Sequence, residues 1–203
     1  MKLYYLPGAC SLASHIVLEW IGAPYETHRV SRDELKSEAY RRISPLGSVP
    51  ALEVDGWVLT QNAAILGFLA DSFPAARLGG DGTPKGRAQV NHWLAFVNSD
   101  VHPAFRPLFG ATAYLADEAA IGKTRAHAKQ VLRGLFERVN EQLRGRDWIA
   151  GTRSIADAYL FVTLRWAHAA AIGLADLQEL GRFYERMHGD ASVVKAIGAE
   201  ETS

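Results

Sequence analysis

The pattern of hydrophobic positions divides the chain into two parts. Up to residue 73, short apolar runs alternate with helically spaced apolar residues, which is typical of a mixed strand and helix domain. After residue 84, apolar residues recur every three or four positions, which predicts helices alone. The residues between these parts include two Pro and three Gly, which indicates a linker. We expect an α/β domain over residues 1–75, a linker over 76–84 and an all-α domain over 85–203.

The first part reads as alternating strands and helices. Its most distinctive feature is Asp55-Gly56 between two apolar runs, because this dipeptide favours the two-residue turn of a β-hairpin. The pattern predicts a strand from Lys2 to Leu6 and a helix that begins near Ser11. The remaining expected elements are a strand at 25–30, a weak helix at 33–43, hairpin strands at 51–54 and 57–59, and a helix at 61–73. The order is βαβαββα.

The helical part carries one clear start signal. Ser154-Ile155-Ala156-Asp157 is an acidic variant of the capping box, in which two side chains satisfy the free N–H groups of a helix end. We therefore assign Asp157 to capping rather than to chemistry, and expect a change at Ser154 to damage folding. Two shorter helices are expected near 175–188 and 191–199.

Composition restricts the possible partners and location. The chain has 22 Lys and Arg against 22 Asp and Glu, and this balance argues against a nucleic-acid or anionic-membrane partner. No apolar stretch approaches the length of a membrane span, and no targeting segment is visible. The single cysteine forbids an internal disulfide and fits a reducing, cytoplasmic location. No metal and no cofactor are expected.

Cys10 is the first candidate for chemistry. It follows a strand in a Pro-Gly-Ala turn and lies at, or just before, a helix N-terminus. Free N–H groups and the helix dipole stabilise a negative sulfur there, whether it belongs to Cys10 or to a bound ligand. A small buried hydrophobic residue is the alternative interpretation, and the position alone favours neither.

Two further segments suit a ligand. Val49-Pro50 immediately precedes the hairpin, and a cis bond there would turn the N–H and C=O of Val49 outward to pair with a ligand backbone. A plain rigid turn is the alternative. Gln61 and Asn62 begin the next helix, where amides beside free N–H groups suit a carboxylate. Simple helix capping is the favoured alternative for this pair.

These segments together resemble the glutathione transferase family. The shared motifs are Tyr-Tyr-x-Pro-Gly-Ala-Cys-Ser at residues 4–11, Pro-x-Gly-x-Val-Pro-Ala-Leu at 45–52, a polar pair opening the helix at 61, and Ser-Ile-Ala-Asp-Ala-Tyr at 154–159. The resemblance covers nearly the whole chain. Gly8-Ala9-Cys10-Ser11 and the Trp166 region are most similar to the bacterial beta class, whose active site carries a cysteine. The resemblance implies a thioredoxin-like N-terminal domain and a homodimer.

The resemblance also implies how glutathione is held. Val49, before a cis-Pro50, pairs with the cysteinyl backbone of glutathione, and Gln61 and Asn62 hold its γ-glutamyl end. The beta class usually has an acid followed by a small hydroxyl residue or Gly at the last two positions, so this chain lacks a charge that would meet the glutathione ammonium.

Basic and acidic contacts are implied elsewhere. A cation is expected to bind the glycine carboxylate, with Lys36 as the candidate and Arg32 as its rival. His102 corresponds to a histidine near the glutathione sulfur, although Pro103 stands where the class often has Lys and is expected to kink the helix. Asp100 matches an acidic position that the class presents across the dimer interface.

Catalysis is expected to involve Cys10, Ser11 and His102. Tyr5 is a further candidate, because other transferase classes use an N-terminal tyrosine, but at a strand end it can also serve packing alone. Three aromatic residues are expected either to line an apolar co-substrate pocket or to pack in the core: Phe105, Phe109 and Trp166. A core or interfacial histidine is the alternative for His102.

The function expected from these features is detoxification by conjugation of glutathione to small apolar electrophiles. Two alternatives stay open. Cys10 could form a mixed disulfide with glutathione in a thiol-disulfide reductase or dehalogenase, with a second glutathione as the resolving thiol. The chain could also be a non-catalytic glutathione-binding protein.

Overall fold

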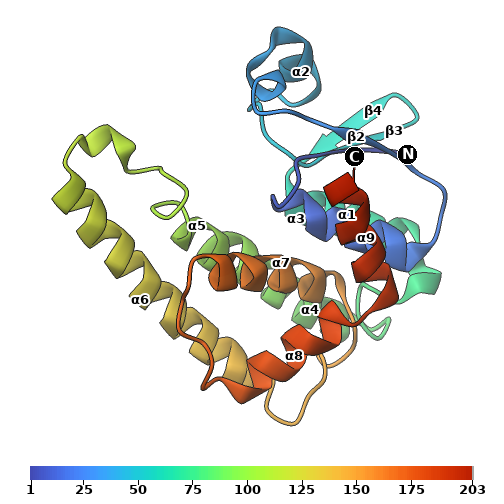
Figure 1. The fold of residues 1–203 in the computed structure, drawn as a ribbon. Coiled ribbons are helices and arrows are strands. Elements are labelled where there is room, and N and C mark those ends of the chain that lie inside the picture. Colours follow the sequence, from blue (N-terminus) through green and yellow to red (C-terminus); the bar gives the residue numbers. More distant parts are fainter. Residues whose placement is uncertain (203) are drawn as a thin grey trace.

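The structure is a computed structural model, and it describes residues 1–202. A four-stranded sheet with three helices forms the N-terminal part, and helices form the rest, which confirms the expected fold class (Figure 1). The N-terminal elements are β1 (Lys2–Tyr5), α1 (Ser11–Ile21), β2 (Glu26–Arg29), α2 (Glu38–Ile43), β3 (Ala51–Val54), β4 (Trp57–Thr60) and α3 (Asn62–Ser72). Within the described range, no helix is both long and apolar enough to span a membrane.

The sheet has the order β2-β1-β3-β4. β1 runs parallel to β2 and antiparallel to β3, and β3 pairs with β4 as the predicted hairpin. Asp55 and Gly56 at its turn have φ angles of 49° and 82°, the left-handed values that a two-residue hairpin turn requires. The weak helix predicted at 33–43 is a 3₁₀ turn (Glu34–Lys36) followed by α2.

Alternation along β1 sends side chains to both faces of the sheet. Leu3 and Tyr5 enter the main core, which also contains buried residues of α1 and α3. Tyr4 points to the other face, where it joins a smaller cluster with Val30 and Tyr40 of the α2 region. Both faces of the sheet are therefore covered, and the turns at the ends of the strands are left to form a site.

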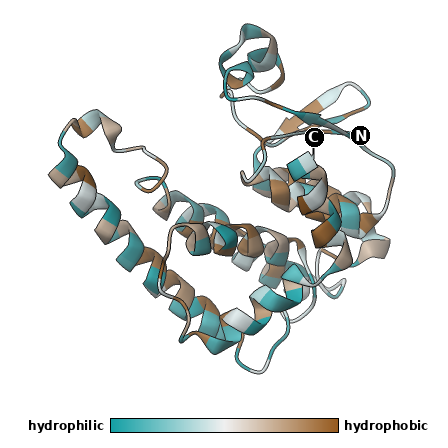
Figure 2. Ribbon diagram, viewed as in Figure 1, coloured by the Kyte–Doolittle hydropathy of each residue, from teal (hydrophilic) through white to brown (hydrophobic). Residues whose placement is uncertain are grey.

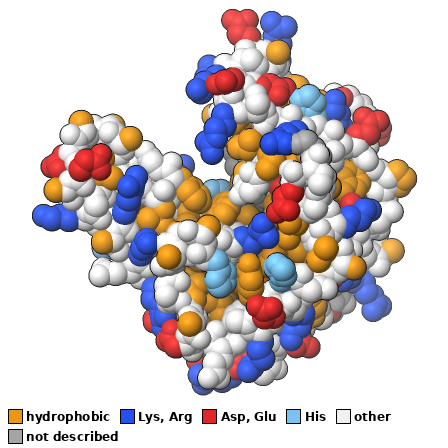
Figure 3. Space-filling model, in the orientation of Figure 1, with side chains coloured by type: hydrophobic (Ala, Val, Ile, Leu, Met, Phe, Trp, Pro, Cys, Tyr) orange, Lys and Arg blue, Asp and Glu red, His pale blue; other side chains and the backbone are white. Residues whose placement is uncertain are grey.

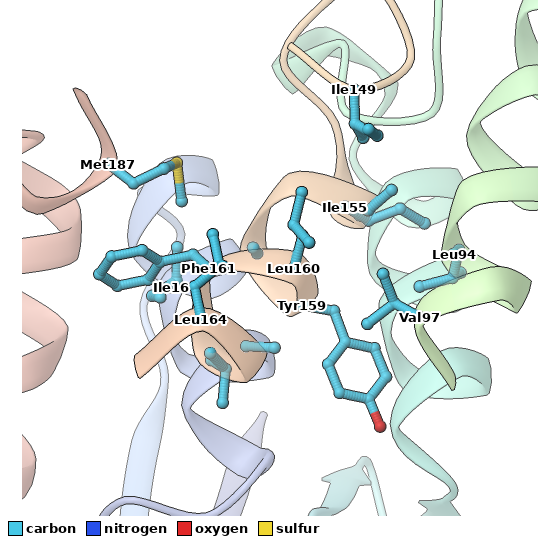
Figure 4. Packing of buried hydrophobic residues seen from close by; sticks show 14 of the residues in the cluster. Ile16, Leu94, Val97, Ile149, Ile155, Tyr159, Leu160, Phe161, Leu164 and Met187 are labelled. Carbon is cyan, nitrogen blue, oxygen red and sulfur yellow. The ribbon is translucent and has the colours of Figure 1, made fainter. Parts of the chain in front are cut away.

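The helical part is arranged around α7. Its elements are α4 (Pro84–Phe96), a π-helical segment (Val97–Val101), α5 (His102–Ala104), α6 (Glu118–Gln142), α7 (Ile155–Ala169), α8 (Gln178–His188) and α9 (Ala191–Thr202). α7 is buried along most of its length and packs against α1, α4 and α8, while α9 returns to pack beside α1 (Figures 1 and 2). Figure 4 shows the α7 side chains within this core, with the hydroxyl of Tyr159 directed away from the cluster.

The predicted capping box is present at the start of α7. Asp157 Oδ2 accepts hydrogen bonds from the backbone N–H and the hydroxyl of Ser154, both at 2.8 Å, and Oδ1 accepts the N–H of Ile149 at 2.9 Å. Burial raises the pKa of Asp157 to about 6, although these hydrogen bonds favour the charged form. Asp157 therefore serves helix capping and loop attachment, as the sequence predicts.

A change of helical pitch precedes His102. Pro103 has no N–H and would crowd the carbonyl one turn earlier in a regular α-helix. The chain instead forms the π-helical segment Val97–Val101, in which the N–H of His102 bonds the carbonyl of Val97, five residues back. The expected kink is thus replaced by a local widening of the helix, which sets the direction of the His102 side chain.

Candidate functional site

A cleft of about 350 Å³ lies between the two parts of the molecule. Figure 3 shows this side of the molecule hollowed between the N-terminal part at the top and the helical arm at the left. The N-terminal wall contributes Cys10, Leu46, Ser48, Val49, Pro50, Gln61 and Asn62. The helical wall contributes Asn98, His102, Pro103, Arg106 and Tyr159. Six of the candidate residues therefore meet in one cavity: Cys10, Val49, Pro50, Gln61, Asn62 and His102.

A larger hollow, of about 740 Å³, lies around the linker. Its lining includes Arg87 and Asp71, which form an ion pair with each other at 2.8 Å, and a glycine-rich turn at 79–82. It contains neither a thiol nor a histidine. We therefore place the functional site in the smaller cleft, where Cys10, Val49 and His102 come together.

Cys10 lies at the N-cap of α1, as predicted. Its Sγ is 3.6 Å from the carbonyl oxygen of Val49, to which the thiol donates a weak hydrogen bond. Burial raises the pKa of Cys10 to about 12, because the cost of burying a thiolate exceeds the help from the N–H groups of Cys10 and Ser11. Cys10 is therefore a thiol at neutral pH.

Ser11 and Tyr5 do not line the cleft. The hydroxyl of Ser11 is buried, donates to the carbonyl of Leu6 at 3.3 Å and lies 3.2 Å from the N–H of the same residue. Tyr5 is buried and packs its ring against His15 at 5.6 Å. Both residues brace the turn that carries Cys10 rather than facing a ligand.

The turn before Cys10 is held from the helical part of the chain. The N–H of Gly8 donates to Glu200 Oε2 at 3.2 Å, and the Nε1–H of Trp166 donates to the carbonyl of Gly8 at 2.8 Å. Glu200 is buried and also contacts His15 Nδ1 at 3.2 Å. Nothing in the local sequence around Glu200 indicates this role, because its partners lie more than 180 residues away.

The Val49–Pro50 bond is cis, as the resemblance to the transferase family implies, rather than the plain trans turn that the residues alone favour. Ser48, one residue earlier, has its carbonyl fixed by the hydroxyls of Tyr40 at 3.1 Å and Ser44 at 2.8 Å. The carbonyl of Val49 faces Cys10 across the floor of the cleft. This wall consequently offers backbone groups in a fixed position.

Gln61 and Asn62 play different parts. Gln61 is exposed and has a φ angle of 73°. Such a positive φ is uncommon for any residue other than glycine, and residues with this strained backbone cluster at functional sites. Asn62 is buried, donates from Nδ2 to the carbonyl of Cys10 at 3.0 Å and accepts the hydroxyl of Ser14 at 2.7 Å. The Asn62 side chain thus joins α1 to α3, and its backbone opens α3 at the edge of the cleft.

His102 faces the cleft from the opposite wall. Its Nδ1 lies 2.5 Å from the hydroxyl of Tyr159, which in turn donates to Asn98 Oδ1 at 3.5 Å. Burial, and then the charge of Arg106, lowers the pKa of His102, so the imidazole is neutral near neutral pH. Tyr159 is buried, and burial raises its pKa, so its hydroxyl keeps its proton.

Tyr159 and Asn98 had no assigned role in the sequence. Tyr159 belongs to the Ser154–Tyr159 motif, but the motif reads as a helix start, and only the packing of α7 against the π-helical segment brings the hydroxyl to His102. The sequence shows that Tyr159 belongs to this motif, but it does not show toward which residue the Tyr159 hydroxyl points.

The three candidate aromatic residues form one cluster. Trp166 lies 5.4 Å from Phe105 and 5.2 Å from Phe109, and Phe105 stacks on Phe109 at 5.7 Å. Trp166 also meets the ring of His102 at 4.8 Å. Phe105 is fully buried and belongs to the core, whereas Phe109 is 57% exposed. An apolar surface formed by Phe109 and Trp166 therefore adjoins His102.

The cations proposed for a carboxylate lie beside the cleft. Lys36, Arg32 and Arg41 line a neighbouring cavity of about 300 Å³, which shares Leu46 with the cleft. Lys36 also makes a long, exposed ion pair with Asp33 at 3.9 Å. Asp100 is exposed on the π-helical segment and does not line the cleft.

The fold and the cleft define a class of protein: a thioredoxin-like domain with a cis-proline beside its cleft, completed by a helical domain. The family model described as "Glutathione S-transferase, N-terminal domain" matches residues 8–72 of this chain. Glutathione S-transferase GST-4.5 of Xanthomonas campestris pv. campestris is 54% identical over 98% of each chain. The chain therefore belongs to the glutathione S-transferase family.

Two solved structures refine this placement. A glutathione S-transferase of a sphingomonad, in complex with glutathione, is 35% identical over 100% of both chains, with a TM-score of 0.88. A bacterial beta class glutathione S-transferase of Sphingomonas chungbukensis is 34% identical over 100% of both chains, also with a TM-score of 0.88. The predicted similarity to the beta class is confirmed.

Proposed function

We propose that the cleft binds glutathione with its sulfur between Cys10 and His102 and transfers it to a small apolar electrophile. The observation that carries this proposal is the meeting of a cis-proline wall, a helix N-terminus and a neutral histidine in one cavity. Membership of the transferase family and a relative in complex with glutathione support the same reading.

Glutathione binding follows from the groups on the N-terminal wall. The backbone of Val49 pairs with the cysteinyl unit, and the N-terminus of α3 receives the γ-glutamyl carboxylate beside Gln61. The side chain of Asn62 holds the turn rather than the ligand, because Ser14 and Cys10 occupy its amide. Lys36 or Arg32 binds the glycine carboxylate from the adjoining cavity.

The chemistry needs a thiolate on glutathione. Neutral His102 accepts the thiol proton, while the N-terminus of α1 and the thiol of Cys10 stabilise the sulfur anion as donors. The sulfur then bonds to the electrophilic carbon. With an aryl halide the halide departs with the bonding electrons; with an epoxide or an enone the electron pair moves to oxygen, and the product takes up a proton. Phe109 and Trp166 provide the adjacent apolar surface.

A reductase cycle through Cys10 has less support. A thiol with a pKa of about 12 is a poor nucleophile at neutral pH. Because the chain has no second cysteine, a mixed disulfide would also have to be resolved by a second glutathione. We further propose a homodimer with exposed Asp100 at its interface, and a detoxifying role in a reducing compartment such as the cytoplasm.

Calorimetric titration with glutathione, combined with conjugation assays on neutral aryl halides, epoxides and enones, tests the proposal. We expect saturable binding and conjugation of at least one electrophile class. Glutathione binding without conjugation would favour the non-catalytic alternative, and a stable adduct on Cys10 by mass spectrometry would favour the reductase. The absence of both binding and conjugation would reject the site.

A further inference from the structure

The charge of the cleft comes from a single lining residue. Arg106 is the charged side chain among the residues that line the cleft, and no acidic side chain lines it within residues 1–202. No ion pair links Arg106 to a carboxylate in this part of the chain. Arg87 and Arg133, by contrast, each bind an aspartate at 2.8 Å or less. Arg106 therefore presents an uncompensated positive charge to the cavity.

The backbone fixes where this charge lies. The N–H of Arg106 donates to the carbonyl of Pro103 at 3.1 Å, and its own carbonyl accepts from Phe109 at 3.2 Å and Ala111 at 3.1 Å. The preceding residue, Phe105, is fully buried. The turn after α5 is consequently anchored, and it holds the backbone of Arg106 against that of Phe109.

The remaining cations near the cleft lie on the opposite wall. Lys36, Arg32 and Arg41 come from the N-terminal part and share their own cavity, where the glycine carboxylate of glutathione is proposed to bind. Arg106 comes from the helical wall, beside His102 and the aromatic surface. This separation leaves Arg106 available for a second anion, carried by the other substrate.

We propose that Arg106 binds a carboxylate on the electrophile, so that the enzyme prefers anionic aromatic electrophiles to their neutral counterparts. This inference rests on the proposed transferase function and extends its co-substrates from apolar electrophiles to aromatic electrophiles that also carry a carboxylate. The aryl ring contacts Phe109 and Trp166, while the carboxylate forms a charge-assisted hydrogen bond with the guanidinium.

A pair of probes isolates the carboxylate. A chlorodinitrobenzoate and the corresponding benzamide carry the same ring, nitro groups and chlorine, and differ in the charge of one substituent. With either probe, the glutathione sulfur bonds to the carbon that bears chlorine. The carbon–chlorine bond breaks, chloride leaves with the bonding electrons, and the thiol proton passes through His102 to solvent. The carboxylate takes no part in these bond changes, but it activates the ring less than the carboxamide does. The change in the ratio of the two probes' kcat/KM values between wild type and Arg106→Met therefore reports on the contact with Arg106.

The test measures kcat/KM for both probes at saturating glutathione in the wild type, Arg106→Met and Arg146→Met. Arg146 is exposed near the end of α6, outside the cleft, and serves as the matched control. We expect Arg106→Met to lower kcat/KM for the benzoate roughly 10- to 100-fold and for the benzamide less than about threefold. Arg106→Lys should retain part of the preference for the benzoate, and Arg146→Met should leave kcat/KM unchanged for both probes.

A second measurement does not depend on turnover. The premade glutathione conjugates of the two probes are titrated into the same variants by calorimetry. We expect the carboxylate conjugate to bind the wild type roughly 10-fold tighter than the carboxamide conjugate, and Arg106→Met to abolish the difference. If the proposed transferase function fails, conjugation is absent in every variant, whereas this binding difference still decides the role of Arg106.

Three results would overturn the inference. The wild type could show the same kcat/KM for the benzoate and the benzamide and bind their two glutathione conjugates equally. Arg106→Met could lower kcat/KM equally for both probes, which would show that the charge of Arg106 assists the chemical step rather than binding of the carboxylate. Arg106→Met could instead raise the KM for glutathione while leaving the ratio of the two probes unchanged, which would assign Arg106 to the glycine carboxylate.

Discussion

The two walls of the cleft are built by different means. On the N-terminal wall, Val49 and the N-termini of α1 and α3 offer backbone groups, and side chains such as Asn62 hold these turns in place. On the helical wall, His102 and Arg106 present their side chains directly to the cavity. A ligand with a constant peptide backbone suits the first wall, and a variable co-substrate suits the second.

This difference teaches how one fold can keep one substrate and change another. Backbone groups survive most substitutions, because every residue type except proline carries both an N–H and a C=O. Side chains on the helical wall can be exchanged singly without disturbing the sheet. We therefore expect glutathione recognition to resist mutation, while rate and co-substrate choice respond to single changes on α5 and α7.

The largest effect is expected at His102. His102→Phe removes the proton acceptor but keeps a ring against Trp166, so kcat for a neutral aryl halide should fall roughly 100-fold with little change in the KM for glutathione. His127→Phe, at an exposed position on α6, is the control. A rise in the KM for glutathione at constant kcat would assign His102 to binding instead.

The pH profile sharpens the same comparison. Burial and the charge of Arg106 lower the pKa of His102, so the neutral, proton-accepting form should persist below the ordinary histidine value of about 6.5. Wild-type kcat should hold through that pH and then fall as His102 gains a proton. The fall should be missing in His102→Phe and should move to higher pH in Arg106→Met.

The next effect concerns the start of α7, which carries Tyr159. Asp157→Ala leaves the N–H groups of Ile149 and Ser154 without a partner, so the free energy of unfolding should decrease by about 2 kcal/mol in urea titrations. Asp117→Ala removes an exposed cap from α6 and should cost no more than about 1 kcal/mol. An equal decrease in the free energy of unfolding for both variants would contradict the claim that a buried cap contributes more to stability than an exposed one.

Asp157 also predicts a pH dependence of stability. Because burial raises its pKa to about 6, the folded chain binds this proton more tightly than the unfolded chain, whose carboxyl titrates near about 4. The contribution of Asp157 to stability should therefore decline as pH rises from about 4 to about 6, and stay constant above. The difference in unfolding free energy between wild type and Asp157→Ala reports this decline; an increase over that range would contradict it.

Tyr159→Phe should have a smaller effect on rate. The substitution removes the hydroxyl that contacts His102 Nδ1 and leaves the packing of α7 intact, so kcat should fall about 10-fold. Tyr184→Phe, on α8 and away from the cleft, is the matched control. An unchanged kcat with a higher KM for glutathione would show that Tyr159 does not act through His102.

The smallest effect is expected at Cys10. Since Cys10 is a buried thiol that acts as one donor among several, Cys10→Ala should keep conjugation within about threefold of the wild type. Slow alkylation of the wild-type thiol by iodoacetamide at neutral pH is the companion observation. A loss of activity of two orders of magnitude would make Cys10 the nucleophile and revive the reductase alternative.

Local signals predicted the elements of the fold, whereas the roles of Val49, Pro50, Gln61 and Asn62 on the N-terminal wall came from the family resemblance. Asp55-Gly56 specifies a hairpin, Ser154 and Asp157 specify a helix start, and the Val49–Pro50 turn precedes a strand, all within a few residues. Each of these features depends on backbone conformation that its own residues control.

The helical wall could be predicted only in part. His102 is predicted through the family resemblance, but Tyr159 reaches the cleft because α7 packs against the π-helical segment, and Arg106 reaches it from the turn after α5. Glu200 reaches Gly8 through the return of α9 along α1. Such placements depend on tertiary packing, which no local pattern in the sequence records.

The most direct test of the central claim is the titration of the glutathione thiol inside the cleft, followed by the ultraviolet absorbance of the thiolate. In the wild type, the bound thiol should be half-ionised roughly one to two pH units below the value of about 8.5 typical of a free thiol. Cys10→Ala should preserve most of this shift, and His102→Phe should reduce it. A bound thiol that ionises no earlier than free glutathione would contradict the account.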